Sequence, residues 1–223
     1  RWVTNGRRAG LVLVLAGAGR GVGAFLVEPG TPGYRVTRAE RTLGVRASET
    51  VTVELDGVRV GPGALLGGEG EGLHHALEAL DLGRVGIAAL ALGIAGSAME
   101  HAVAYSLQRR QFGRFVADFG STQAKLADMY RRIAAARALV HHAGDAVERS
   151  RSGAHPRTGP EGVTALAAAA KLAASETATW VADEAVQIFG GYGYMRDYPV
   201  ERPLRDAMRH VIAREVLRAA RAG

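Results

Sequence analysis

The segment QIFGGYGYMRDYP, residues 187–199, follows a long alanine-rich stretch and carries three glycines within four positions. The end of a helix needs one glycine, just past the last helical residue, where the chain turns into the left-handed conformation. The further glycines need a second reason. One interpretation is a tight turn between two helices. The other is that the missing side chains let another group approach the backbone closely.

The sequence around this segment has the period of long helices. From about residue 70 onward, apolar residues recur at helical spacing in four segments, 73–109, 122–150, 160–189 and 199–222. The stretch SRSGAHPRTGP (150–160) has the composition of a linker, and its Pro160 suits the first turn of the third helix. Four amphipathic segments with short connections predict an antiparallel four-helix bundle.

The faces that these helices bury can be predicted from the same period. In the first helix the expected buried stripe is Leu77, Leu80, Ile87, Leu90 and Ile94. In the second helix it is Leu126, Met129, Ile133, Ala136, Val140 and Val147.

The first 69 residues show strands and turns instead. The apolar runs LVLVLA (11–16) and GAFLVE (23–28) and the alternating run TVTVELDGVRV (50–60) predict strands, with a turn signal at Asp56-Gly57. GAGRGVG (17–23) is close to a dinucleotide fingerprint, but Val22 occupies the last glycine position and a strand follows, so we expect a hairpin turn. The fold class is therefore α+β, with an antiparallel β domain at 1–69 and a helical bundle at 70–223.

Composition excludes several kinds of site and location. The chain has no cysteine, which excludes disulfides, thiolate metal sites and a cysteine nucleophile. The histidines occur as the adjacent pairs 74–75 and 141–142, which diverge on a helix, so no metal site is expected. No apolar run approaches the ~20 residues that span a bilayer, and the first ten residues lack the apolar core of a signal peptide. We expect a cytoplasmic protein without a membrane span.

The net charge of +6 raises nucleic acid as a partner,. The basic pairs are scattered, however, acidic residues accompany them, and all basic residues except Lys125 and Lys171 are arginines. This skew is typical of genome composition, and no nucleic-acid partner is expected. The cluster QRRQFGRF (108–115) leaves two interpretations open: arginines that bind phosphate bidentately, or a solvated helix end.

Five stretches resemble blocks of the acyl-CoA dehydrogenase family, and they stand in the family's order. They are RWVTNG (1–6), LGVRASETVTVELDGVRV (43–60), LDLGRVGIAALALGIAGSAMEHAVAYSLQRRQFGR (80–114), QAKLADM (123–129) and AVQIFGGYGYMRDYPVERPLRDA (185–207). The resemblance covers essentially the whole chain. It implies part of the family's middle β domain, followed by the C-terminal four-helix bundle.

The resemblance also implies FAD as the cofactor. Two blocks would contact the FAD that a neighbouring subunit holds, with the arginine near its pyrophosphate: Arg109, Gln111, Phe112, Gln187, Ile188, Phe189, Gly190 and Gly191. A third block would lie against the flavin ring: Trp2, Val3 and Thr4. Because each site would draw on two chains, a homodimer or a homotetramer is implied.

The implied reaction is α,β-dehydrogenation of an acyl-CoA thioester. A carboxylate removes the α proton while a hydride leaves the β carbon for the flavin, and hydrogen bonds to the thioester carbonyl stabilise the developing enolate. Asp81 and Arg84 match positions that line the acyl-CoA site. An electron-transfer flavoprotein is the implied electron acceptor.

The catalytic carboxylate has no counterpart in this sequence. Family members carry a glutamate either on a loop that would fall between Met208 and Arg209 or at the position of Gly83. Here LRDAM runs directly into RHVIAREV, so a loop of about ten residues is skipped. Neither Glu78 nor Glu215 matches a family base.

Two explanations of the missing carboxylate stay open. In one, a mobile loop, and residues before the first arginine, are omitted from this sequence. In the other, the chain lacks the loop and is a noncatalytic homologue that serves in binding or assembly. One continuous helix through Leu204, Val211 and Leu217 would favour the second explanation.

Overall fold

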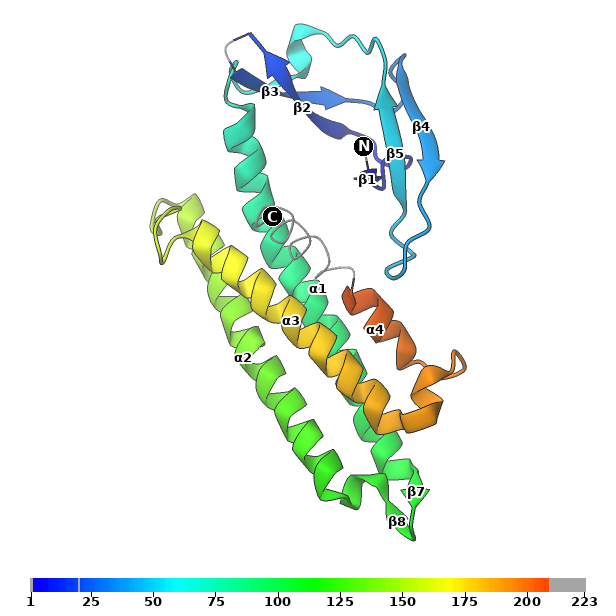
Figure 1. Cartoon of the computed structure of the whole chain (residues 1–223). Helices are drawn as coiled ribbons and strands as arrows, with labels where there is room; N and C mark the ends of the chain where they lie inside the picture. The colour runs from blue at the N-terminus through cyan, green and yellow to red at the C-terminus, as the bar shows by residue number, and fades with distance from the viewer. Residues whose placement is uncertain (1, 20, 209–223) are drawn as a thin grey trace, which may run out of the picture. The chain divides into compact units, whose positions relative to one another are not determined.

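The computed structural model describes residues 2–19 and 21–208, and Figure 1 shows the course of the chain. Six strands precede the first helix in the described part: β1 (Trp2–Thr4), β2 (Val12–Ala18), β3 (Gly21–Val27), β4 (Tyr34–Ala39), β5 (Thr50–Leu55) and β6 (Leu65–Leu66). The remaining elements are α1 (Gly72–Gln108), β7 (Arg110–Gln111), β8 (Arg114–Phe115), α2 (Gly120–Arg151), α3 (Val163–Phe189) and α4 (Glu201–Met208). The rest of the fourth predicted helix, including Glu215 and the proposed continuation through Val211 and Leu217, lies outside the described residues.

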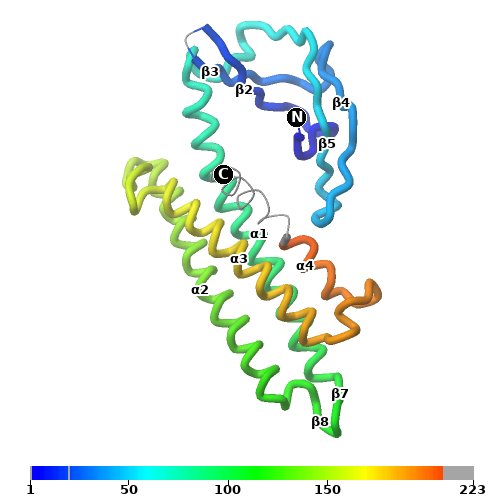
Figure 2. Tube along the Cα trace, in the orientation of Figure 1, coloured from blue at the N-terminus to red at the C-terminus, as the bar shows by residue number. Residues whose placement is uncertain are grey.

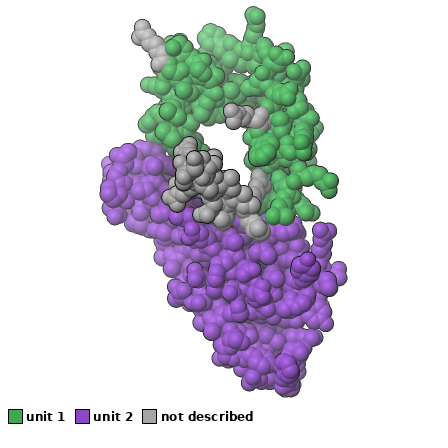
Figure 3. Space-filling view, viewed as in Figure 1, with its two compact units in different colours: residues 1–80 green, residues 81–223 purple. Residues whose placement is uncertain are grey.

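The chain divides into two compact units, Arg1–Leu80 and Asp81–Gly223, which have different colours in Figure 3. The first turns of α1 belong to unit 1 because Gly72 lies against β3. A Cβ on Gly72 would stand 2.5 Å from the backbone nitrogen of Ala24.

Unit 1 contains two antiparallel sheets with the strand orders β1-β5-β4 and β2-β3-β6. The pairing of β2 with β3 places Ala18 opposite Gly21, which confirms the hairpin expected at 17–23. A small core forms where alternate strand residues point inward: Val27, Tyr34, Val51 and Val53. The sequence did not predict β1, β4 or β6, because β1 and β6 are very short and β4 carries two arginines among its six residues.

Unit 2 buries a face of α1 that differs from the predicted one. The residues of α1 that are fully buried are small and recur every three or four positions: Ala88, Ala91, Ala95, Ala98, Ala102 and Ser106. Most of the predicted stripe is wrong, because Leu77, Leu80 and Leu90 are 49%, 54% and 44% exposed. Its last member, Ile94, does pack partly against the core. Alanines let helix backbones approach closely, and this close approach places the leucine face on the outside.

The helices α2 and α3 lie side by side in unit 2, as Figures 1 and 2 show. The predicted face of α2 is confirmed: its four central members are buried and the outer two pack partly against the core. The predicted start of α3 at residue 160 is wrong. Pro160 lies in the preceding turn and the helix begins at Val163, whose backbone N–H donates to the carbonyl of Pro156 at 3.1 Å.

Among the described residues, α1 alone is long and apolar enough to cross a membrane by length and composition. The expectation that no apolar run has that length is therefore not supported. Core helices of folded proteins meet the same criterion, and the alanine face of α1 contributes to the core of the bundle.

Candidate functional site

The end of α3 forms one wall of the candidate site. At Gly190 the backbone has φ 59° and ψ −137°, which residues with a Cβ rarely adopt. A short 3-10 turn, Gly190–Tyr194, follows. Within it Gly193 is buried, and a Cβ on Gly193 would stand 2.5 Å from the carbonyl oxygen of Val186. Backbone conformation explains Gly190 and close packing explains Gly193, so neither of these two glycines requires a ligand.

Gly191 has no such reason. Its φ is ordinary and a Cβ at this position would meet nothing within 4 Å. The missing side chain instead keeps the surface beside the turn hollow. The tight-turn interpretation therefore does not explain why residue 191 is a glycine.

An open pocket of about 990 Å³ lies against this turn. Its wall combines the end of α3 and the turn after it with the end of α1 and the segment leading to α2. The lining residues are Tyr105, Arg109, Gln111, Val116, Ile188, Phe189, Gly190, Gly191, Tyr192, Met195, Asp197 and Tyr198. Six of the eight bundle residues proposed to contact FAD, from two distant blocks of sequence, therefore line one pocket.

Aromatic stacking holds the pocket wall in place. The rings of Tyr105 and Phe189 stack at 4.0 Å between centroids, and the Tyr105 hydroxyl donates to the Phe189 carbonyl at 3.3 Å. Tyr198 packs against Phe189 and Tyr192 at 6.0 Å and 5.1 Å. Burial raises the pKa of the Tyr105 phenol above its ordinary value of 10.0, against the opposing effect of the nearby positive charge of Arg109.

Arg109 supplies the positive charge of the pocket. Its guanidinium carbon lies 5.1 Å from the centre of the Tyr192 ring, in the range of a cation–π contact. In the described part of the chain no carboxylate pairs with Arg109, although Asp197 lines the same pocket. The guanidinium can therefore meet an external anion without first breaking an ion pair.

Two proposed contact residues, Phe112 and Gln187, do not line the pocket. Phe112 occupies the two-residue turn between β7 and β8, with φ 51°, and is 93% exposed. Gln187 is exposed on the last turn of α3. Both side chains are exposed and therefore accessible to a second molecule.

The residues proposed to lie against the flavin ring belong to unit 1. In β1, Trp2 pairs with Thr52, Val3 with Val51 and Thr4 with Thr50. The Trp2 side chain is 78% exposed, which leaves its ring free to contact a planar group.

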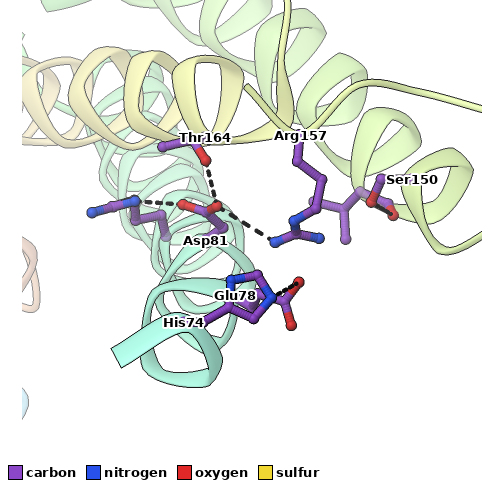
Figure 4. Close-up of polar contacts among 8 residues, drawn as sticks. His74, Glu78, Asp81, Ser150, Arg157 and Thr164 are labelled. Atoms are coloured by element: carbon purple, nitrogen blue, oxygen red, sulfur yellow. Dashed lines mark hydrogen bonds and ion pairs between the residues drawn. The ribbon is translucent and has the colours of Figure 1, made fainter. Parts of the chain in front are cut away.

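The proposed substrate residues, Asp81 and Arg84, form an ion pair one helical turn apart on α1. Asp81 is 3% exposed. Thr164 Oγ1 donates to Asp81 Oδ2 at 2.7 Å, and Arg157 Nη2 lies 3.7 Å from the same oxygen (Figure 4). Gly83, one of the two positions at which the resemblance led us to look for the base, is exposed, and a Cβ there would meet nothing within 4 Å.

Sequence reasoning missed several residues of these sites, among them Tyr105, Tyr198, Arg157 and Thr164. Tyr105 stands four positions before Arg109, and this spacing on one helix face could have revealed it. Arg157 and Thr164 lie in and just after the stretch assigned as a linker, and nothing in their local pattern marks them. Only the three-dimensional fold brings them to Asp81.

Together, the β unit, the helical bundle and the open, cation-bearing pocket define an α+β protein with a candidate ligand site. A sequence model of the acyl-CoA dehydrogenase C-terminal domain matches residues 70–214. The acyl-CoA dehydrogenase of Bacillus subtilis (strain 168) is 48% identical over 211 residues, which are 92% of this chain and 53% of that protein. The chain therefore belongs to the acyl-CoA dehydrogenase family, as the sequence blocks indicated.

Solved structures agree with this assignment. Butyryl-CoA dehydrogenase from Megasphaera elsdenii matches with a TM-score of 0.86 at 43% identity, over 94% of this chain and 54% of that one. An acyl-CoA dehydrogenase from Bacillus anthracis, complexed with FAD, matches with a TM-score of 0.81 at 31% identity, over 95% of this chain and 38% of that one. The α+β fold class is confirmed. The chain spans about half the length of the curated relatives that it matches.

Proposed function

We propose that the protein to which this chain belongs catalyses flavin-dependent α,β-dehydrogenation of an acyl-CoA thioester. The observation that carries the proposal is the opening beside Gly191 in the wall of the pocket. The cation that lines this pocket, Arg109, forms no ion pair with a carboxylate of the described residues. A hollow wall beside a guanidinium that carries no carboxylate partner among the described residues suits part of a large anionic cofactor.

The residues of the pocket fit FAD in both shape and charge. Gly190 and Gly191 leave a surface without side chains, against which a large flat group can lie. The Arg109 fork matches the geometry of phosphate oxygens. The remaining contacts would come from Gln111, Ile188 and Phe189.

When bound, FAD supplies a flavin ring that accepts a hydride from the substrate. The chain's own residues have other tasks. The pocket wall orients and shields the cofactor, and Arg84 offers N–H donors to the substrate. No residue is assigned as the base, because Gly83 has no side chain to offer and the alternative position follows Met208, where the described residues end.

The proposed partners follow from the same site. We propose a second copy of the chain, as a homodimer or homotetramer, since Phe112 projects fully exposed beside the pocket-lining segment. An electron-transfer flavoprotein is the proposed electron acceptor and the cytoplasm the proposed location.

Anaerobic titration of the purified full chain with butyryl-CoA tests the function. We expect the visible flavin absorbance to bleach as the substrate is oxidised. Flavin that stays oxidised across acyl-CoA thioesters of short, medium and long chains would contradict dehydrogenation and support the noncatalytic alternative. Mass spectrometry of the intact purified protein complements this test. A mass well above the 23.4 kDa of this sequence would mean that the protein has further residues, which could include a loop that carries the base.

A further inference from the structure

The carboxylate of Asp81 is fully engaged by protein donors. Oδ1 accepts a hydrogen bond from Arg84, and Oδ2 accepts one from Thr164 while facing Arg157 (Figure 4). Only 5% of the Asp81 side chain is exposed. A carboxylate with both oxygens occupied and almost no exposed surface has little to offer a ligand.

Arg84 is in the opposite situation. Its side chain is 35% exposed, and the bond from Nη1 to Asp81 is the one polar contact found for it among the described residues. A guanidinium carries five N–H donors. One edge of Arg84 is therefore fixed by Asp81, and the other donors remain available for an external acceptor.

Thr164 fixes the orientation of Asp81. It is the second residue of α3, and the preceding N-cap, Gly162, makes no side-chain hydrogen bond. The Asp81 carboxylate instead brings negative charge to the first turn of α3, where the helix dipole favours it. Arg157 at 3.7 Å is too distant for a hydrogen bond,. The hydrogen bond from the Thr164 hydroxyl is therefore the directional contact that holds the carboxylate from the side opposite Arg84.

We propose that Thr164 is a positioning residue that acts through Asp81 on Arg84, which the proposed function places at the CoA thioester. The inference rests on the proposed function. It divides the two proposed substrate residues into one that contacts the substrate and one that holds its neighbour. It also gives the α2–α3 connection, which carries Arg157 and leads to Thr164, a role at the substrate site.

A purely structural role makes a different prediction. If Asp81 and Thr164 only tie the start of α3 to α1, then removing the Thr164 hydroxyl changes the unfolding temperature. Its effect on substrate binding would then be the same with or without Arg84. If Thr164 acts through Arg84, the effect on binding disappears once the guanidinium is gone, as a double-mutant cycle measures.

The experiment measures the Kd of the flavin-loaded full chain for crotonyl-CoA, the product of butyryl-CoA dehydrogenation. Thr164→Val removes the hydroxyl while keeping the shape, and Thr164→Ser retains it. The matched control is Thr179→Val on the same helix, because within residues 2–19 and 21–208 the hydrogen bond of the Thr179 hydroxyl goes to a backbone carbonyl, that of Ser175, at 3.1 Å. Thr164→Ala is measured in parallel, since it adds no bulk that folding must accommodate.

We expect Thr164→Val and Thr164→Ala to raise the Kd about tenfold, the loss typical of one hydrogen bond to a charged group. Thr164→Ser and Thr179→Val should keep the Kd of the parent. In an Arg84→Gln background, Thr164→Val should add no further loss. An unchanged Kd for Thr164→Val, or an equal tenfold loss in the Arg84→Gln background, would overturn the inference and leave the proposed function standing. A parent protein that binds no crotonyl-CoA and is not bleached by any acyl-CoA would overturn both.

Discussion

Gly193 lies against Val186 so closely that a Cβ on Gly193 would stand 2.5 Å from the Val186 carbonyl oxygen. Two residues earlier, a Cβ on Gly191 would meet nothing within 4 Å. The three glycines of this turn therefore have three different roles. Gly190 supplies the backbone conformation, Gly193 supplies room for packing, and Gly191 leaves an opening in the wall of the pocket.

Alanine substitutions should separate these roles. We expect Gly193→Ala to lower the free energy of unfolding by about 2 kcal/mol, because the added methyl overlaps a backbone carbonyl. Gly191→Ala should leave stability within about 0.5 kcal/mol but weaken FAD binding about tenfold, because the methyl enters the cofactor's space. Chemical denaturation and flavin fluorescence titration measure the two quantities. Full flavin affinity in Gly191→Ala would show that the opening does not hold the cofactor.

The sequence predicted the helices well and the burial of α1 poorly, for a physical reason. Helical period identifies which residues share a face, but it does not say which face is buried when one face is leucine and another is alanine. In α2, where the long apolar residues share one face, the prediction is confirmed. In α1 the close approach of the helices selects Ala91 and Ala95 over Leu80 and Leu90.

The candidate site shows the same limit. Resemblance identified the two blocks that meet at the pocket, because each is continuous in sequence. The contact between Asp81 and Thr164 spans 83 positions and depends on how α1 and α3 pack. No local pattern in a single sequence carries that information.

Arg109 should bind flavin phosphate through the shape of its side chain as well as its charge. Arg109→Lys keeps the charge but loses the planar fork, and we expect FAD affinity to fall about tenfold. The matched control is Arg110→Lys, because Arg110 stacks on Phe115 at 4.1 Å and does not line the pocket. Flavin fluorescence titration of both variants measures the difference. Equal losses would mean that general positive charge, rather than the Arg109 fork, attracts the cofactor.

Alkaline pH should destabilise the pocket wall through Tyr105. Burial raises the pKa of this phenol above 10.0 in the folded chain, so the unfolded chain loses the phenolic proton at lower pH. The stability that the neutral phenol contributes is therefore fully present below pH 10.0 and is lost as the pH rises through the folded pKa.

Tyr105→Phe tests this dependence because it keeps the stack on Phe189 and removes the titrating group. Urea midpoints between about pH 9 and pH 11 should fall less steeply in Tyr105→Phe than in the parent. Burial also raises the pKa of Tyr34, whose hydroxyl donates to the Gly6 carbonyl at 2.8 Å in unit 1. Tyr34→Phe therefore serves as a comparison that reports on the other unit. Parallel slopes for the parent and Tyr105→Phe would exclude a contribution from Tyr105.

Phe112 has a costly backbone for an exposed aromatic residue. Residues 112 and 113 form a two-residue hairpin turn in which both φ angles are positive, 51° and 80°, and such a turn favours Asn-Gly. The Phe112 ring contacts Phe119 only edge-on, at 6.4 Å between centroids. Phe112→Asn should therefore stabilise the isolated subunit by about 0.5 kcal/mol or leave its stability unchanged.

If the Phe112 ring contacts a second copy of the chain, the same variant should weaken self-association about tenfold. Sedimentation equilibrium measures that loss, with Leu172→Asn, a change to an exposed residue on α3, as a control for removing surface hydrophobicity. A Phe112→Asn variant that associates as tightly as the parent would exclude this hairpin from the contact between copies.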